Sequence, residues 1–519
     1  MSIPSVLLSG VRNESQDLQI TTDVLEPNVL NSVQAVFVIP KKASVLDSKS
    51  ALKVRVDWSA QAGGTATDVG GKMFSGILGL IKTARLYASG QLISRLDNAG
   101  EYIHLKNQFK SQEYKEEYCD IKHGSESGFL VAEDSAQSGV NGAIQTTDSF
   151  DVRTAGTNNV VCNNKPYFRG IGTDADNNGM EMFLLLEELF PMLKDIQLPV
   201  RFLKDEIRIE IDWEQDKSKW LYTGGTALAN YNDVVVREAV MFLDYITYNP
   251  EIDASLEATL TNTGVSIPFR QTAVITKVLA GGSAVAQTNV SEDVLLGQEG
   301  RAVMKMYVSK HYPSNIANGG AIYNNAGGEN FAYTLQGNCR SDALLNEKFN
   351  FVVNDLLLYD RNVENRKEAY NYLCYAGETA YSTYPTAWDA NPSFGLAPAP
   401  TTDVLYNSNS ANDADQLVLS HAPLAPARNA TQSKGIVQNG IMGTQNYISA
   451  DLSKYGSQLN PANAMRIGAT PVILRLIRDT TANNQNVNTI ASSPVSLTIY
   501  VEYLRLFDLR AGDLGVRDL

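Results

Sequence analysis

Alternation of apolar and polar residues with a period of two is the feature that most constrains the fold of this chain. Successive side chains of a strand leave opposite faces of a sheet, so this period predicts half-buried antiparallel strands. Four segments have this pattern: 52–58, 207–213, 304–308 and 495–503. More continuous apolar runs predict strands buried on both faces, or strand pairs, at 33–39, 234–248, 265–279 and 472–477. The predicted fold class is all-β.

Helical patterns are few and short. The clearest covers 98–119, where Asn98 and Glu101 have capping-box spacing and Tyr102, Leu105 and Phe109 form one stripe. Two further short helices are predicted at 364–375 and 251–263. Loop composition, rich in Gly, Ser or Pro, predicts connections at 61–76 and 124–145 and a long surface insertion at 377–434.

A weak internal repeat divides the chain into two halves. The apolar run 80–87 ends in Leu86-Tyr87, and the run 349–359 ends in Leu358-Tyr359, which lies 272 residues later. A turn and a predicted helix follow each run. We therefore predict domains at 1–249 and 265–510, a connecting segment at 250–264, and a mobile C-terminal tail at 511–519.

Charge and targeting signals exclude several classes of function. The chain of 519 residues has 43 Lys plus Arg against 57 Asp plus Glu, a net charge of −14, which would repel a polyanion. Direct nucleic-acid binding is therefore not expected. The N-terminus lacks a signal-peptide pattern, and the longest apolar block, 182–193, is interrupted by Glu187 and Glu188, so no membrane span is predicted.

Catalytic motifs are absent from the sequence. The four cysteines have no C-x-x-C spacing, and the four histidines have no i, i+4 spacing; each histidine is predicted to be a surface or satisfied core residue. Neither a nucleophile elbow nor a phosphate-binding loop is complete. The paired carboxylates Glu116-Glu117 and Glu187-Glu188 are predicted to be solvated. No catalytic residue and no cofactor is expected.

One acidic stretch matches the start of a calcium-binding loop. Asp174, Asp176 and Asn178 precede Gly179 with the spacing of alternating oxygen ligands, which makes these three residues a weak candidate metal site. Position twelve of such a loop needs a bidentate carboxylate and here is Leu185. An acidic surface turn is therefore the favoured interpretation.

Tyrosine is unusually frequent among the aromatic residues, with 24 Tyr against 16 Phe and 4 Trp. A tyrosine ring covers apolar area while keeping one polar end, which suits contacts between chains. Several tyrosines fall in predicted loops: Tyr312, Tyr323, Tyr381, Tyr384 and Tyr406. They indicate either a binding surface or ordinary loop packing.

These features together resemble the double jelly-roll major capsid proteins of double-stranded DNA viruses, such as polinton-like viruses, virophages and nucleocytoplasmic large DNA viruses. The likeness covers about residues 18–510. Three stretches support it: 85–93 resembles a hairpin of the first jelly roll, 189–200 resembles its later proline-containing turn and strand, and 206–213 resembles the strand that follows. The family has no catalytic residues to transfer.

The resemblance implies a fold, a role and partners. The fold would be two consecutive eight-stranded antiparallel jelly rolls with short helices and long loop insertions. The chain would form a homotrimeric, pseudo-hexagonal capsomer that tiles an icosahedral virion shell, assembled inside the host cell. Its partners would be its own copies, neighbouring capsomers, and penton and minor or cement capsid proteins. The resemblance leaves contact with an internal membrane undecided.

Two alternatives remain at the level of sequence. A viral spike, fibre or other glycan-binding β-sandwich protein would need a shallow groove lined by Trp or Tyr. A glycoside-processing β-sandwich enzyme would need two carboxylates about 5 to 10 Å apart across a cleft.

Overall fold

The computed structural model describes the strands and helices of both halves of the chain. The described residues are 18–42, 44–58, 76–107, 118, 122–124, 180–215, 234–279, 290–311, 347–363, 372, 448–453, 464–478 and 495–519. The predicted insertion at 377–434, the connection at 124–145 apart from Gly124, and the five loop tyrosines lie outside them: Tyr312, Tyr323, Tyr381, Tyr384 and Tyr406. The predicted helix 364–375 also lies outside them except for Tyr372.

Two antiparallel sheets form the first half. One has the strand order β1-β10-β5-β8, with β4 also pairing with β10, and the other has the order β2-β3-β9-β6-β7. Their strands are β1 (Leu18–Leu25), β2 (Val29–Leu30), β3 (Gln34–Ile39), β4 (Val45–Leu46), β5 (Ala51–Trp58), β6 (Ile81–Ala88), β7 (Gln91–Asp97), β8 (Met180–Leu185), β9 (Ile207–Trp213) and β10 (Val234–Tyr248).

Two further antiparallel sheets form the second half. Their strand orders are β11-β19-β13-β16, to which β17 and β20 add, and β12-β18-β14-β15. Their strands are β11 (Val265–Leu279), β12 (Val290–Gly297), β13 (Ala302–His311), β14 (Glu347–Val353), β15 (Leu356–Leu357), β16 (Ser449–Asp451), β17 (Met465–Arg466), β18 (Val472–Arg478), β19 (Val495–Arg510) and β20 (Asp513–Asp518).

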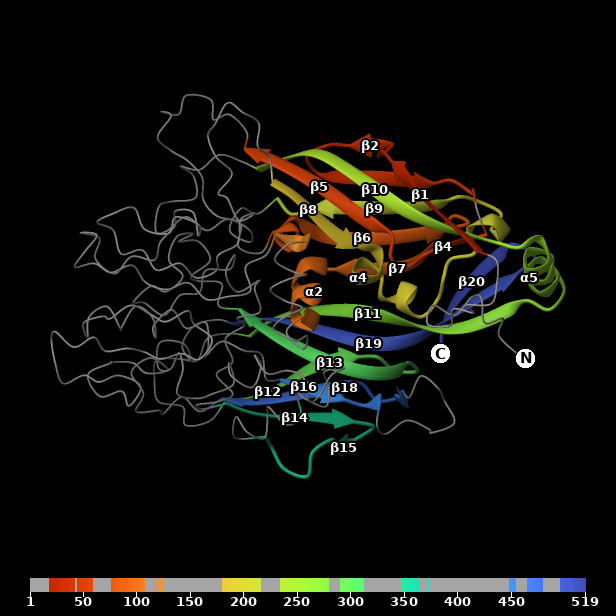
Figure 1. The fold of residues 1–519 in the computed structure, drawn as a ribbon. Coiled ribbons are helices and arrows are strands. Elements are labelled where there is room, and N and C mark those ends of the chain that lie inside the picture. The colour runs from red at the N-terminus through yellow and green to blue at the C-terminus, as the bar shows by residue number, and fades with distance from the viewer. Residues whose placement is uncertain are drawn as a thin grey trace, which may run out of the picture.

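The two halves have the same connectivity. If the accessory strands β2, β4, β17 and β20 are set aside, each half keeps eight strands that can be numbered in chain order. In both halves the two sheets then have the orders 1-8-3-6 and 2-7-4-5. Two four-stranded sheets with this connectivity form a jelly roll. The four sheets follow one another across the molecule, first half above second half in Figure 1.

Side-chain alternation explains why these segments are strands. In β9 the inward side chains Ile207, Ile209, Ile211 and Trp213 are buried, whereas Arg208 is exposed. β3 shows the same alternation. The buried faces of all four sheets contribute to a large hydrophobic cluster. The eight strands predicted from periodicity and apolar runs are confirmed, and each long apolar run is one strand rather than a pair.

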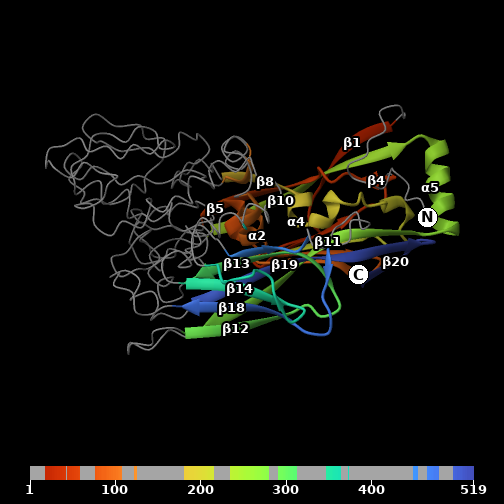
Figure 2. The same cartoon turned by 90° about the horizontal axis from the view of Figure 1, so that it is seen from below.

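Short helices cover the ends and one side of the sheets. α1 (Ile77–Leu80), α2 (Ala99–Asn107), α4 (Leu186–Leu189), η3 (Pro191–Lys194) and η4 (Val200–Phe202) belong to the first half. α5 (Pro250–Asn262) joins β10 to β11 and lies at one end of the molecule in both views (Figure 1 and Figure 2). Asn249 caps α5 by accepting a hydrogen bond from the Glu251 amide, and Pro250 occupies its first turn. The predicted helices at 98–119 and 251–263 are confirmed where the structure describes them.

Two predictions need correction. The C-terminal segment 511–519 is not a mobile tail, because β20 pairs with β19 from Arg510↔Asp513 to Arg505↔Asp518. The repeat was detected with the wrong register: Leu86-Tyr87 lies in β6, whereas Leu358-Tyr359 follows β15. The strand equivalent to β6 is β14, which ends at Val353. Residues 80–87 and 349–353 therefore lie in equivalent strands of the two halves. The dipeptides Leu86-Tyr87 and Leu358-Tyr359, from which the offset of 272 residues was taken, do not lie at equivalent positions.

Candidate assembly site

The sequence predicts one candidate metal site and no catalytic residue. Asp174, Asp176 and Asn178 lie outside the described residues. Among the residues that are described, no group of three or more His, Cys, Asp or Glu could hold a metal ion. The same part of the chain has no helix long and apolar enough to cross a membrane.

Glu188 departs from its prediction, because it is buried rather than solvated. Its Oε2 lies 3.1 Å from Nε2 of His123, a fully buried imidazole, and it accepts a hydrogen bond from the Leu185 amide. Burial alone would raise the pKa of Glu188, but the charge and hydrogen bond of His123 outweigh it and lower that pKa. Glu187, the preceding residue of the same short helix, remains partly exposed and pairs with Lys49 at 2.8 Å.

A buried polar cluster joins the two halves of the chain. Lys106, at the end of α2, donates to Glu502 of β19 at 2.9 Å and to the Tyr307 hydroxyl of β13 at 3.2 Å. The Tyr102 hydroxyl, one turn earlier in α2, donates to the same carboxylate at 2.7 Å. Because Glu502 is buried, these donors replace the water that its charge would otherwise bind.

The cluster keeps the Tyr102 hydroxyl protonated. Burial raises the pKa of Tyr102 well above its usual value of 10, and the negative charge of Glu502 raises it further. Lys106 acts in the opposite direction but does not cancel these effects. Tyr102 therefore serves as a hydrogen-bond donor between the halves, and its ring packs 5.4 Å from that of Tyr500.

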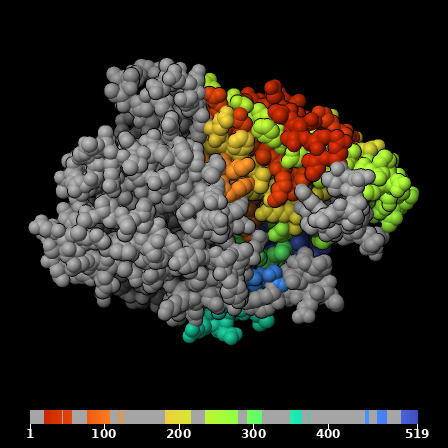
Figure 3. Space-filling model, in the orientation of Figure 1, coloured from red at the N-terminus to blue at the C-terminus, as the bar shows by residue number. Residues whose placement is uncertain are grey.

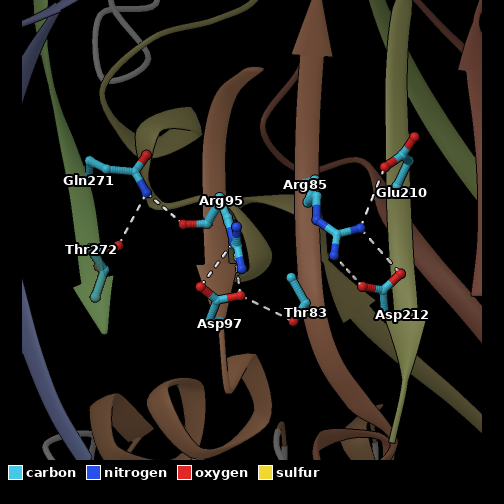
Figure 4. A network of polar contacts seen from close by, with 8 residues as sticks. All are labelled: Thr83, Arg85, Arg95, Asp97, Glu210, Asp212, Gln271 and Thr272. Atoms are coloured by element: carbon cyan, nitrogen blue, oxygen red, sulfur yellow. Dashed lines mark hydrogen bonds and ion pairs between the residues drawn. The ribbon is translucent and has the colours of Figure 1, made fainter. Parts of the chain in front are cut away.

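The same boundary brings together two edge strands. β7 is the last strand of its sheet, β11 is the first strand of its own, and the two lie side by side. Gln271 of β11 donates to the Arg95 carbonyl of β7 at 2.6 Å, and Arg505 of β19 donates to the Ile93 carbonyl at 3.3 Å. Side chains of the second half therefore satisfy carbonyls on the edge of β7. Figure 4 shows Gln271 reaching the Arg95 backbone.

Charged pairs flank this boundary. Arg85 of β6 contacts Asp212 at 2.5 Å and Glu210 at 3.5 Å, both on β9, and Arg95 pairs with Asp97 within β7 (Figure 4). Burial opposes the charge of Arg85, but the hydrogen bond and charge of Asp212 raise its pKa overall. Across the boundary, Arg270 of β11 pairs with Asp195 at 3.0 Å. Such contacts orient neighbouring strands and connect the two halves.

Large apolar side chains remain exposed on other edge strands. Ile20 and Val24 lie on β1, and Leu356 and Leu357 form β15. β1 and β15 are terminal strands of the two sheets farthest from the boundary between the halves. The periodicity of the sequence did not identify this surface. An apolar residue that is exposed on an edge strand has the same sequence pattern as one that is buried in the core.

Comparisons with known proteins identify the fold. No protein-family model matches the chain, and no curated protein matches its sequence. The PBCV-1 virus capsid structure matches at 12% identity over 98% of both chains, with a TM-score of 0.53. The Faustovirus major capsid protein matches at 12% identity over 96% of this chain and 91% of its own, with a TM-score of 0.52. The Sputnik virophage structure matches at 12% identity over 98% and 90%, with a TM-score of 0.52.

Proposed function

We propose that this chain, which has the double jelly-roll fold of viral major capsid proteins, is itself a major capsid protein. The observation that carries the proposal is the repeated strand order 1-8-3-6 and 2-7-4-5, together with a likeness that spans nearly the whole length of both chains compared. In this role the protein is a structural component of a virion and has no catalytic activity. The buried contacts between its halves hold the two jelly rolls in a fixed relative position.

The proposed assembly unit is a homotrimer with a pseudo-hexagonal outline. Each chain supplies two jelly rolls, so three chains supply six similar units around one axis. The proposed domains are 1–249 and 265–510, joined by 250–264, which contains α5. The two domains are connected by the buried hydrogen bonds of Lys106 and Tyr102 to Glu502, which supports a trimer built from rigid chains. A shell needs subunits whose domains keep a fixed relative position.

The proposed partners follow from this role. Copies of the chain would contact one another within and between capsomers, and penton and minor or cement proteins would complete the shell. A net charge of −14 argues against the shell protein itself gathering nucleic acid by charge attraction. The location of the protein would be the virion, after assembly in the host cell.

Light scattering on the purified chain tests the proposed assembly unit. A trimer of the 56.6 kDa chain has a mass of about 170 kDa. A stable monomer at all concentrations, combined with specific binding on a glycan array, would contradict the proposal and favour a glycan-binding β-sandwich protein.

A further inference from the structure

The hairpin of β19 and β20 turns at the end of the molecule where α5 joins the two halves. α5 and β20 lie toward this end in both views, whereas α2, which carries Lys106, lies farther along the molecule (Figure 1 and Figure 2). The light-green chain that includes α5 forms the surface at the right margin of Figure 3. The turn of this hairpin is therefore separate from the buried cluster around Glu502.

The turn between β19 and β20 contacts the first half directly. The Gly512 carbonyl accepts a hydrogen bond from the Lys204 amide at 3.2 Å. The Ala511 amide donates to the Leu260 carbonyl of α5 at 2.9 Å. The Lys204 side chain also forms an ion pair with Asp513, the first residue of β20. The hairpin of the second half is thus attached both to the first half and to the helix that connects the halves.

Apolar contact contributes little to the attachment of β20. Of its six residues only Leu514 is buried, and Gly515 and Val516 are partly buried. β9, a strand of similar length, buries four of its seven residues. Segments that bury few apolar side chains open locally at a lower free energy than the core strands do. β20 therefore depends more than β9 on its backbone hydrogen bonds and on its charges.

All three charged residues of β20 form ion pairs with residues outside this strand. These pairs are Asp513–Lys204, Arg517–Asp508 at 2.9 Å, Asp518–Arg301 at 3.0 Å and Asp518–Arg505 at 2.8 Å. Every side chain in them reaches solvent, from 22% exposed for Arg505 to 71% for Asp513. Dissolved salt screens such exposed pairs, since the Debye length falls from about 10 Å at 0.1 M to about 3 Å at 1 M.

We propose that residues 511–518, which comprise the turn and β20, form a salt-sensitive clasp between the two jelly rolls that opens at high ionic strength while both jelly rolls stay folded. Opening separates Gly512 from Lys204 and uncovers the edge of β19 that pairs with β20. The buried pair of Lys106 and Glu502 is screened much less by salt, so it keeps the halves joined when the clasp is open. The clasp belongs to the single chain and does not depend on the proposed function.

Hydrogen–deuterium exchange of the full chain at about 0.1 M and about 1 M sodium chloride tests the clasp. The β20 amides are expected to exchange about tenfold faster at the higher salt, because several weak ion pairs are screened together. The Lys204 amide is expected to accelerate in parallel, since it loses the Gly512 carbonyl, whereas the β9 amides keep their rates. Equal β20 rates at both salts, acceleration of β20 without Lys204, or equal acceleration of β9 would each overturn the proposal.

Asp518→Asn isolates the contribution of charge, because it removes the shared partner of Arg301 and Arg505 while keeping the size of the side chain. Its β20 amides are expected to exchange faster already at about 0.1 M salt, with a smaller further change at about 1 M. Asp293→Asn is the matched control, since it removes a carboxylate from an exposed pair with Arg475 on another sheet. An equal effect of the two variants on β20 would contradict the proposal. The salt series on the unmodified chain needs no substitution and decides the proposal where a variant folds poorly.

A charge exchange tests the connection to the first half. Lys204→Asp places two carboxylates together, and Asp513→Lys places two ammonium groups together, so each variant alone is expected to speed the exchange of β20. The double variant restores a pair of opposite charges at two side chains that are more than half exposed. Its β20 amides are expected to return toward the rate of the unmodified chain. A double variant that exchanges as fast as the single variants would overturn the role of this pair in the clasp.

Discussion

The Lys106 Nζ atom lies 2.9 Å from Glu502 Oε1, although the two residues are 396 positions apart and belong to different jelly rolls. Both side chains are largely removed from water. Replacing Lys106 by Ala leaves a buried carboxylate without its main countercharge, which is expected to lower the free energy of unfolding by about 3–5 kcal/mol. Chemical denaturation of the purified variant measures this loss.

A second ion pair across the halves supplies the control. Lys204 and Asp513 also connect the first half with the second, but both side chains are more than half exposed. Lys204→Ala is expected to cost no more than about 1 kcal/mol. Equal losses for Lys106→Ala and Lys204→Ala would contradict the special role of the buried pair.

Alkaline pH is expected to weaken the same boundary through Tyr102. The pKa of its hydroxyl is raised in the folded chain, so its contribution to stability is complete below pH 10 and is lost as pH rises further. One such group contributes a slope of at most about 1.4 kcal/mol per pH unit. Denaturation between about pH 9 and pH 11 should show a shallower decline for Tyr102→Phe than for the unmodified chain. An unchanged slope would contradict this assignment.

Acid pH is expected to act through Glu188. The pKa of Glu188 is lowered in the folded chain, so the stability that it contributes is present above its usual value of 4.5 and is lost as pH falls through the folded value. Glu188→Gln should therefore be less stable than the unmodified chain near neutral pH, and the difference should shrink in acid. Thermal melting over this pH range provides the measurement. Glu187→Gln, which makes the same change of charge at the neighbouring, partly exposed position, is the matched control.

Close packing between α1 and α2 leaves no room for a side chain at Gly100. A Cβ atom there would lie 1.6 Å from the Leu78 carbonyl oxygen, so the helices would have to separate. Gly100→Ala is expected to destabilise the chain by about 1–3 kcal/mol, as is typical of overpacking. At Gly515 the nearest atom to an added Cβ is Asp508 Cβ at 3.8 Å, an ordinary contact. Gly515→Ala should therefore leave the melting temperature nearly unchanged.

Strands were the most predictable part of this fold. The boundaries of β10 and β11 agree with the long apolar-rich runs read from the sequence. Their side chains are not all covered, since Ser266, Thr276 and Val278 of β11 are exposed. β20 was missed, since Arg517 and Asp518 make its sequence resemble a solvated tail. Its pairing depends on a partner strand, β19, whose position along the sheet is set by the tertiary fold.

The boundary between the halves could not be predicted from local patterns. Glu502 was recognised only as a polar position in an alternating strand, and Lys106 as part of a helix. Their pairing requires knowledge of which sheet faces which. The same reason explains Glu188, whose buried partner His123 lies 65 residues away in the sequence. The candidate cation residues Asp174, Asp176 and Asn178 remain a sequence prediction.

Electron cryo-microscopy of the purified oligomer tests the central claim most directly, because it shows how the jelly rolls are arranged. The account predicts six similar lobes around a three-fold axis, two from each of three chains. A monomer, or an oligomer without three-fold symmetry, would contradict it.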